Sequence, residues 1–331
     1  MPVIPSAICL IENHRIFYRG QDALALAKTA SLEEVAAILW KADAAPHSLT
    51  ASLLAHRSRH RRGGGGGEGQ LGIIERCQVR LAELSATDLA ALDLSSAGVA
   101  RTARIILGQL AAVVGGSEPS SQPLHRQLAA AWNLDERGAD ILRCCLVLLA
   151  DHELNASTFV ARCVASTGAT PYAVVSGALN ALSGRKHGGQ SAQVEALLRE
   201  LGDEANPLLV LAARLARGEA LPGLGQPLYP HGDPRARAII DTLAETIPLA
   251  GARVAAAVTA ATQLTGEHPN VDFGLGAASV ALGLPRGAAL GIFLVARAVG
   301  WLAHAMEQYE TDVLIRPRAR YIGRRPSASA G

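Results

Sequence analysis

Apolar residues recur every three or four positions along most of the chain. From about residue 70 onward they form stretches of ten to eighteen residues, which short groups of Gly, Pro, Ser and Asn separate. This spacing predicts amphipathic helices joined by turns. The clearest stretches are GVARTARIILGQLAAVV, ERGADILRCCLVLLADHE, SAQVEALLRELG, PRARAIIDTLAETI and PRGAALGIFLVARAVGWLAHAMEQ. No repeat of fixed period links them, which argues against a helical solenoid. We therefore predict a mainly α-helical fold.

The first forty residues add a different pattern. ICLIENHRIFYRG alternates enough to predict a short β-hairpin, and the helical stretches QDALALAKTA and SLEEVAAILWKA follow it. Ser31 is expected to cap the second helix, because acidic residues occupy the first turn after it. We expect this helix to dock one apolar face, formed by Leu32, Val35, Leu39 and Trp40.

A run of glycines interrupts the helical pattern in residues 57–69, RSRHRRGGGGGEG. Five consecutive glycines cost too much backbone entropy for the interior of a helix. The basic residues beside them could form a nucleic-acid patch, but no aromatic residues lie among them and no basic stripe extends them. We predict a solvated surface loop here.

Composition and charge narrow the class of protein. The 331 residues are 49% hydrophobic but only 4% aromatic, so the apolar mass is Ala, Leu and Val, which favour helices. This length is enough for two domains and a substantial core. The formal charge of +2 gives no field strong enough to gather nucleic acid or an anionic membrane.

The cysteines and the N-terminus indicate the compartment. The cysteines are odd in number and lack CxxC spacing, so neither a disulfide framework nor a zinc site is expected. The N-terminus MPVIPSAICLIENHR lacks the layout of a signal peptide. No apolar run approaches the roughly 20 residues that span a bilayer. We expect a soluble, cytoplasmic protein without a metal centre.

Two histidines lie where polar groups interrupt the predicted helices. His152 follows the apolar run CCLVLLA between two acids, and a core histidine with satisfied hydrogen bonds would give the same pattern. His187 lies in the turn SGRKHGG, just before a predicted helix. Glycines let a ligand approach closely, and a helix N-terminus stabilises negative charge and keeps an imidazole neutral. An incidental histidine in a tight turn is the alternative reading.

Two later segments offer further candidate contacts. The Gly/Pro-rich loop LPGLGQPLY, residues 221–229, leads to Arg235 at a predicted helix start. In PNVDFG, Asp272 stands between apolar neighbours, and partial burial would raise the pKa of its carboxyl toward the range of a general base. A helix cap would account for the same acid without any chemistry.

The last candidates are arginines. Arg297 lies in the middle of the apolar stretch ARAVGWLAH, where a guanidinium needs a partner or a bound anion. Arg316 belongs to LIRPRARYIG, a basic and strand-like segment near the C-terminus.

Taken in order, these segments resemble the citrate synthase family. The motifs are DHELNASTF, the S-G-x-x-H-G-G turn, the P-G-x-G loop with DPRA, NVDF, AR-x-VGW-x-AH-x-x-EQ and RPR-A-x-Y-x-G. YRG and SLEEVAAILW also look like the N-terminal segment of that family. The resemblance covers residues 5–45 and roughly 95–323, and six motifs in register make it specific.

The resemblance implies roles for the candidate residues. Asp272 matches the base that removes a proton from the methyl group of acetyl-CoA, and His187 matches the donor to the enolate oxygen. The carboxylates of oxaloacetate would be held by Arg235, Arg297 and Arg316, with His152 assisting. Arginine suits this task because its planar fork meets a carboxylate in bidentate fashion.

The resemblance also implies an architecture and a partner. A large helical domain, residues 1–188 and 281–331, would carry a small one, residues 189–280, that closes over the substrate. Arg316 would reach across to the site of a second subunit, which makes the enzyme a homodimer. CoA would act as a co-substrate, with no tightly bound cofactor. Its adenine would lie against the loop residues Pro222, Gly223, Leu224 and Gly225.

One position departs from the family at the reacting centre. Gln226 stands where the family has the histidine that polarises the oxo group under attack. An amide can donate a hydrogen bond but cannot deliver a proton. Gln190 and Ser191 also replace the Ala-Asn that often follows the HGG turn. We expect an acyltransferase that makes citrate or a homologue, possessing reduced activity. A non-catalytic paralogue that binds dicarboxylate or CoA, and a citryl-CoA lyase, are the alternatives.

Overall fold

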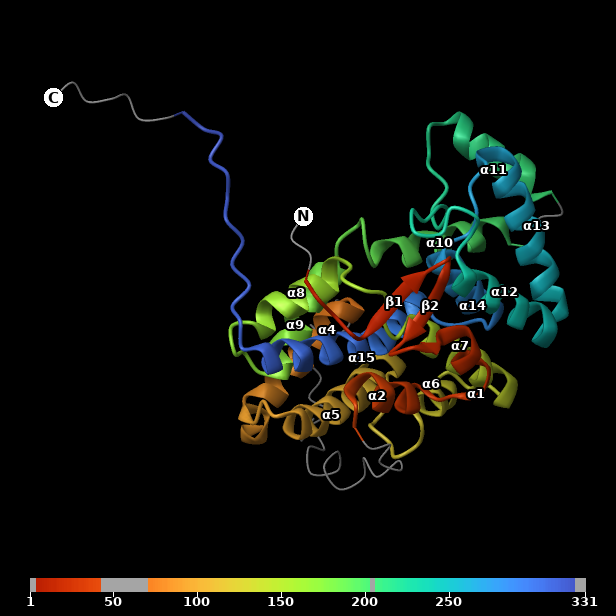
Figure 1. Ribbon diagram of the computed structural model, residues 1–331. Helices are drawn as coiled ribbons and strands as arrows, with labels where there is room; N and C mark the ends of the chain where they lie inside the picture. The colour runs from red at the N-terminus through yellow and green to blue at the C-terminus, as the bar shows by residue number, and fades with distance from the viewer. Residues whose placement is uncertain (1–3, 43–70, 203–205, 325–331) are drawn as a thin grey trace.

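The computed structural model describes residues 4–42, 71–202 and 206–324, and helices dominate these residues (Figure 1). The glycine run at 57–69 lies outside the described residues. The helices are α1 (Ala23–Thr29), α2 (Leu32–Trp40), α4 (Ile73–Ser85), α5 (Ser96–Gly115), α6 (Leu124–Ala131), α7 (Glu136–Leu149), α8 (Ala156–Ala165), α9 (Pro171–Leu182), α10 (Gly189–Leu201), α11 (Pro207–Ala216), α12 (Pro234–Thr246), α13 (Pro248–Thr265), α14 (Val271–Ala281) and α15 (Ala288–Thr311).

The predicted N-terminal hairpin is confirmed. Strands β1 (Cys9–Glu12) and β2 (Arg15–Tyr18) pair antiparallel, and the short β3 (Gln21–Asp22) pairs with β2. The hydroxyl of Tyr18 is buried and donates to the backbone oxygen of Val147, 3.0 Å away at the end of α7. The hairpin is therefore fixed to the helical body next to the loop that carries His152.

The predicted cap of α2 is also confirmed. The Ser31 hydroxyl accepts from the backbone N–H of Glu34 at 3.2 Å, and the Glu34 carboxylate accepts from the N–H of Ser31 at 2.6 Å. This capping box satisfies two N–H groups that the helix itself leaves unpaired. At the other end of α2, Trp40 Nε1 donates to the Val299 oxygen of α15 at 3.0 Å. The cap and the tryptophan together fix α2 on the central helix.

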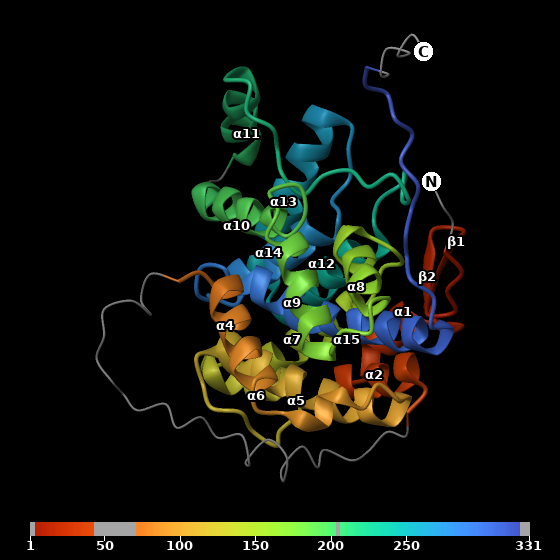
Figure 2. The same ribbon diagram turned by 90° about the vertical axis from the view of Figure 1, so that its left-hand side faces the viewer.

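The core is built around α15. In Figures 1 and 2 this helix lies between α2 and α5 on one side and α10, α11 and α13 on the other. It also packs against α7, α8 and α9. Both α5 and α15 are long and apolar enough to cross a membrane by length and composition, which corrects our expectation that no such run exists. However, 78% and 94% of their apolar windows are buried inside the helical body, as in core helices of soluble proteins.

Close packing joins α10 to α14 on one side of the molecule. A Cβ added at Gly276 of α14 would lie 2.6 Å from Val194 Cγ1 of α10, so only glycine permits this approach. Helix α10 begins two residues after His187, and Asp272 is the second residue of α14. Their packing therefore decides how far apart these two residues lie.

Two segments differ from the sequence predictions. The helix predicted to reach Glu153 ends at Leu149, because Glu153 has a φ of 50° and Asn155 already caps α8. The strand-like segment after α15 pairs with no strand among the described residues and runs away from the body, exposed and extended (Figure 1). Gln308 Nε2 donates to the Val313 oxygen at 2.8 Å, and beyond Val313 no hydrogen bond ties this segment to the rest of the described chain.

Candidate active site

The loop between α7 and α8 places His152 against the Gly/Pro-rich loop. His152 is 8% exposed, and its Nε2 lies 3.1 Å from the hydroxyl of Tyr229. Burial and the nearby positive charges of Arg235 and Arg297 hold the pKa of His152 well below its ordinary value. The ring is therefore neutral at physiological pH and forms one hydrogen bond with the hydroxyl of Tyr229.

His187 lies two residues before α10 begins, and its ring contacts α8 and α15. Its Nε2 lies 2.8 Å from Ser157 Oγ, and its ring meets that of Phe293 edge-on with centroids 5.8 Å apart. Burial, and secondarily Arg297, lower the pKa of His187 to about 4. The prediction of a neutral ring is confirmed, and burial is the largest cause of the lowered pKa.

Ser157 is the centre of a small hydrogen-bond network beneath His187. Trp301 Nε1 donates to Ser157 Oγ at 3.1 Å, and Asn155 Oδ1 lies 3.0 Å from the same hydroxyl. Ser157 and Trp301 are fully buried. Ser157 belongs to the NAST part of the first motif, but the sequence alone did not indicate a function for it. Its partners come from α15 and from the turn before α10, so only the fold brings them together.

The Gly/Pro-rich loop is tied to the NVDF segment by backbone contacts. Asn270 N donates to the Gly223 oxygen at 2.9 Å, and Gly225 N donates to the His268 oxygen at 2.8 Å. Gly223 has a φ of 77°, and a Cβ there would lie 2.5 Å from a methyl group of Val194. A side chain would thus be strained and would clash, so glycine is required at this point. The loop and Asp272 consequently form one unit.

Asp272 is the second residue of α14. Asn270 caps this helix by accepting from the backbone N–H of Asp272 at 3.0 Å, which points the start of α14 into the site. The Ser191 hydroxyl of α10 donates to the Asp272 carboxylate. Burial raises the pKa of Asp272, although Ser191 and the positive charges of Arg235 and Arg297 act in the opposite direction. The sequence prediction of a raised pKa is confirmed.

Arg235 is held by an acid that the sequence analysis did not single out. Its Nε and one terminal nitrogen lie 3.0 and 2.7 Å from the two carboxylate oxygens of Asp233. Asp233 also caps α12 and accepts from Val271 N at 3.2 Å. Both members of this pair are buried. The Asp-Pro-Arg spacing at a helix start could have indicated the pair, because an N-cap acid lies close to the second helical residue.

Arg297 is the least satisfied cation of the site. It is 1% exposed, its Nε donates to the Leu149 oxygen at 2.8 Å, and its guanidinium carbon lies 4.8 Å from the centroid of the Phe293 ring. One terminal nitrogen is buried without any hydrogen-bond partner. A buried guanidinium nitrogen without a partner is costly unless an anion binds it. This arrangement suits a carboxylate ligand.

The structure brings most of the predicted residues into one region. Arg235 and Arg297 both act on the pKa values of His152 and Asp272, and Arg297 also acts on that of His187. These side chains come from helix starts, from the α7–α8 loop and from the middle of α15. The region therefore combines a partly buried acid, two neutral imidazoles and two buried guanidinium groups. It can withdraw a proton, donate a hydrogen bond and bind an anion.

Gln226 lies beside this region in a cavity of about 540 Å³. Its Oε1 accepts from the Leu228 N–H at 3.3 Å. The cavity is lined by Leu221, Leu224, Gly225, Gln226, Pro227, Tyr229, Pro230, Thr265, Glu267 and His268. Two of the four predicted CoA-loop residues, Leu224 and Gly225, thus line it, while Pro222 and Gly223 are buried beneath.

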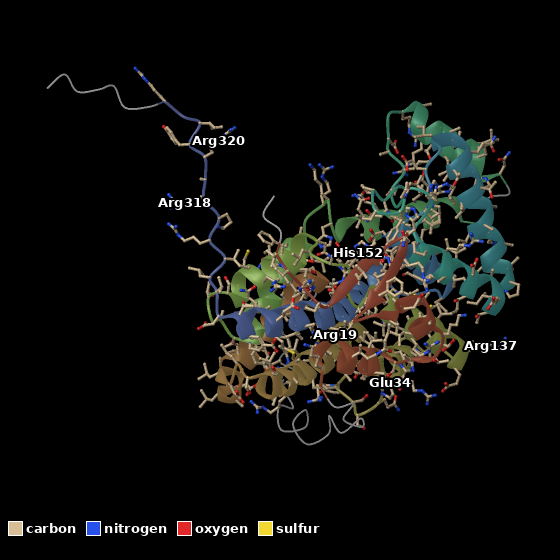
Figure 3. The ribbon with its side chains drawn as sticks, in the orientation of Figure 1. Arg19, Glu34, Arg137, His152, Arg318 and Arg320 are labelled. Carbon is tan, nitrogen blue, oxygen red and sulfur yellow. The ribbon has the colours of Figure 1, made fainter. Side chains whose placement is uncertain are left out.

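Arg316 is not part of the region within one chain. It is exposed in the extended segment after α15. Figure 3 shows Arg318 and Arg320 farther along this segment, well away from the labelled His152. Within the described parts of the chain, no group of three or more His, Cys, Asp or Glu side chains could hold a metal ion.

Comparison with known proteins places the chain among its relatives. A family model described as citrate synthase, C-terminal domain, matches residues 1–318. The chain belongs to the citrate synthase family. This family member is 31% identical to 2-methylcitrate synthase of Mycobacterium tuberculosis (strain H37Rv), over 94% of this chain and 86% of that protein.

Other relatives agree in family but differ in coverage. The citrate synthase family member is 39% identical to citrate synthase 2 of Bacillus subtilis (strain 168) over 54% of its length, and the match spans about half, 49%, of that relative. The crystal structure of citrate synthase from Pyrobaculum aerophilum matches 100% of this chain and 92% of its own, with a TM-score of 0.77 and 25% identity. The predicted helical, citrate synthase-like fold is confirmed.

One solved relative carries ligands. The ternary complex of Thermoplasma acidophilum citrate synthase with carboxymethyl coenzyme A and oxaloacetate has a TM-score of 0.76 and 20% identity, over 100% of this chain and 96% of that one. At this identity the match shows that the two proteins share a fold.

Proposed function

We propose that the protein is an acyltransferase that condenses acetyl-CoA, or another short acyl-CoA, with oxaloacetate to give citrate or a homologue and CoA. The observation that carries the proposal is Asp272, a partly buried carboxylate of raised pKa in a region with the neutral His187 and the unpartnered nitrogen of Arg297. The relatedness to 2-methylcitrate synthase over 94% of the chain supports the same reaction class.

The first step is removal of a proton from the acyl methyl group. Asp272 accepts this proton, and burial makes its carboxylate a stronger base than an exposed one. The electron pair of the broken C–H bond moves into the thioester, whose oxygen becomes an enolate. His187 donates a hydrogen bond to that oxygen, a role that a neutral imidazole fills without losing its proton.

Condensation and release follow. The enolate carbon attacks the 2-oxo carbon of oxaloacetate, a C–C bond forms and the C=O π bond breaks. The resulting alkoxide takes a proton from solvent, and the protonated Asp272 returns its proton to solvent. Water then cleaves the thioester, which gives the free carboxylate and the CoA thiol. Gln226 stands at the sequence position where the family has the histidine that polarises the attacked oxo group, and its amide donates a hydrogen bond only. We therefore expect slow turnover.

Oxaloacetate would be bound through its two carboxylates. Arg297 offers a buried terminal nitrogen without a partner, and Arg235 is oriented by Asp233. His152 adds a neutral ring beside Tyr229. We assign the remaining cation, Arg316, to the site of a second subunit, because its extended segment leaves the body of its own chain. The active form is then a homodimer. We also propose that it is cytoplasmic.

The domain assignment follows from the same proposal. Residues 189–280 would form a small domain that carries the CoA loop Pro222–Gly225 and closes over the substrate. Residues 1–188 and 281–331 would form the large domain. Closure excludes water from the enolate. A non-catalytic paralogue that binds dicarboxylate or CoA is the second candidate, and Gln226 is the observation that favours it.

A thiol-release assay separates the two candidates. The purified protein is mixed with oxaloacetate and acetyl-CoA or propionyl-CoA, and the free thiol is followed colorimetrically. An acyltransferase releases CoA only when both substrates are present, and Asp272→Asn abolishes release while calorimetry still detects oxaloacetate. If the wild type binds ligands without release from either thioester, the enzyme proposal is wrong and the paralogue reading holds.

A further inference from the structure

Helix α10 buries two polar side chains four residues apart. Ser191 is fully buried and Glu195 is 3% exposed. Residues four apart lie on the same face of a helix, so both point toward α14 and α15. Helix packing alone gives no reason for a buried acid, because an apolar side chain of similar size packs there without desolvating a carboxylate.

Glu195 connects three helices through its carboxylate. One oxygen accepts from the Ser279 hydroxyl of α14 and from Ala289 N of α15 at 2.9 Å, and the other accepts from Gly287 N at 2.9 Å. Gly287 is the N-cap of α15 and has no side chain of its own to cap the helix. Glu195 therefore supplies this cap from α10, where a negative charge also suits the helix dipole.

A second contact from α10 supports the same junction. Arg199, one turn farther along α10, donates from a terminal nitrogen to the Leu284 oxygen at 3.0 Å. Leu284 lies in the turn between α14 and α15. The helix that follows His187 thus fixes both α14, which carries Asp272 in its first turn, and α15, which holds Arg297.

Ser191 makes the direct contact with the acid. Its hydroxyl donates to Oδ1 of Asp272, one turn of α10 before Glu195. A bond at one carboxylate oxygen fixes the rotation of the group and leaves the other oxygen free for a substrate. Ser191 contacts Asp272 directly. Glu195 instead holds the three helices in the arrangement that allows this contact.

We propose that Ser191 and Glu195 form a positioning pair for Asp272, in which Ser191 orients the carboxylate and Glu195 locks α10, α14 and α15 around it. This inference rests on the proposed function for its kinetic consequences. Ser191 acts on the reaction through the Asp272 carboxylate and Glu195 acts through the helices around it, so both are positioning residues.

The kinetic test uses Ser191→Ala, Ser191→Thr and Glu195→Gln. Misplacement of a catalytic group by about 1 Å costs on the order of 10²-fold in rate, so Ser191→Ala and Glu195→Gln should lower kcat by about 10- to 100-fold. For Ser191→Ala the KM for oxaloacetate should stay within about twofold, because the Ser191 hydroxyl contacts Asp272 and not the arginines. Ser191→Thr keeps the hydroxyl and should recover most of kcat. Glu200→Gln, an exposed charge on the same helix, is the matched control and should match wild type.

The pH profile separates positioning from loss of fold. Because the Ser191 bond lowers the pKa of Asp272, Ser191→Ala should move the acid limb of kcat to higher pH, whereas Glu200→Gln should leave it in place. An active wild type with unchanged kcat and acid limb in Ser191→Ala overturns the positioning role and leaves the proposed function intact.

An inactive wild type would instead refute the proposed function. In that case the titration of the Asp272 carboxyl, followed by ¹³C NMR in wild type and Ser191→Ala, decides the inference. A higher pKa in Ser191→Ala supports the contact, and equal pKa values reject it. Thermal unfolding of each variant identifies those that fail to fold, and Ser191→Thr then carries the comparison.

Discussion

The imidazole Nε2 of His187 lies 2.8 Å from Ser157 Oγ, and this serine has one hydrogen for two acceptors. Trp301 already donates to the hydroxyl, so the serine hydrogen goes either to Asn155 Oδ1 or to His187 Nε2. If it goes to His187, the neutral ring carries its own proton on Nδ1 and can donate from there. If it goes to Asn155, Nε2 donates to Ser157 and Nδ1 becomes an acceptor.

The proposed reaction requires that Ser157 donate to His187 Nε2, so that Nδ1 carries the proton of the ring. We therefore predict that Ser157→Ala is strongly impaired. Without the serine hydroxyl, Nε2 has no donor and the ring no longer holds the tautomer that donates to the enolate. We expect kcat to fall on the order of 10- to 100-fold, in the range of a lost or misplaced catalytic group. Steady-state assays of thiol release measure this, with the KM for oxaloacetate as internal control. A kcat within twofold of wild type would show that the tautomer is set elsewhere.

Gln226 gives the second prediction. Gln226→His should raise kcat, because an imidazole both polarises the attacked oxo group and delivers a proton, and general acid catalysis contributes typically about 10²- to 10⁴-fold. Gln226→Ala should lower kcat further, since the amide donor is lost. The thiol-release assay measures all three proteins with the same substrates. An inert Gln226→His with normal oxaloacetate binding would favour the non-catalytic paralogue.

Local sequence patterns were sufficient to predict the helices and the hairpin, but not which side chains contact one another in the site. The box at Ser31, the hairpin and the start of α10 after His187 follow from residues within a few positions of one another. Ser157 and His187 lie thirty residues apart, and their contact exists only because α8 and the turn before α10 both face α15. No periodicity encodes that distance.

The direction of the Asp272 pKa shift was predictable from the sequence, but the contacts that set it were not. An acid between apolar residues pointed to a raised pKa for Asp272, yet the opposing hydrogen bond comes from Ser191, a residue 81 positions away on another helix. Arg297 was expected to need a partner or a bound anion, and which of its nitrogens lacks a partner depends on how Leu149 and Phe293 pack around it. The role of Arg316 could not follow from one chain, because its side chain is exposed in an extended segment that leaves the described body of that chain.

Protonation of His187 gives a prediction for stability. The folded ring has a pKa of about 4, against an ordinary value of 6.5. Between these values the unfolded chain binds a proton that the folded chain does not, so the free energy of unfolding falls as pH drops from 6.5 toward 4. His152 acts in the same direction, because its pKa is also lowered.

Denaturant unfolding across that pH range measures the effect. His187→Asn should show a shallower loss of stability between pH 6.5 and 4 than wild type, because one of the histidines with a lowered pKa is no longer there to titrate. Measurements at pH 7.5 and 8.5, above both values, are the control and should give the same pH slope in both proteins. Parallel curves throughout the acid range would mean that the His187 ring is not shielded from protonation.

Sharing of Arg316 between subunits leads to a complementation experiment. Arg316→Ala and Asp272→Asn should each be inactive as homodimers. When the two variants are co-expressed, a mixed dimer contains one site with the acid of one subunit and the arginine of the other. Half of the dimers are mixed in a random assembly, so about a quarter of the wild-type activity should return.

The outcome depends on where the arginine acts. If Arg316 serves the site of its own chain, every site in the mixture lacks one group and no activity returns. Tagging each variant differently and purifying through both tags isolates the mixed dimer, whose activity should be about half that of wild type. The extended course of residues 313–324, away from the site of its own chain, is why we expect recovery.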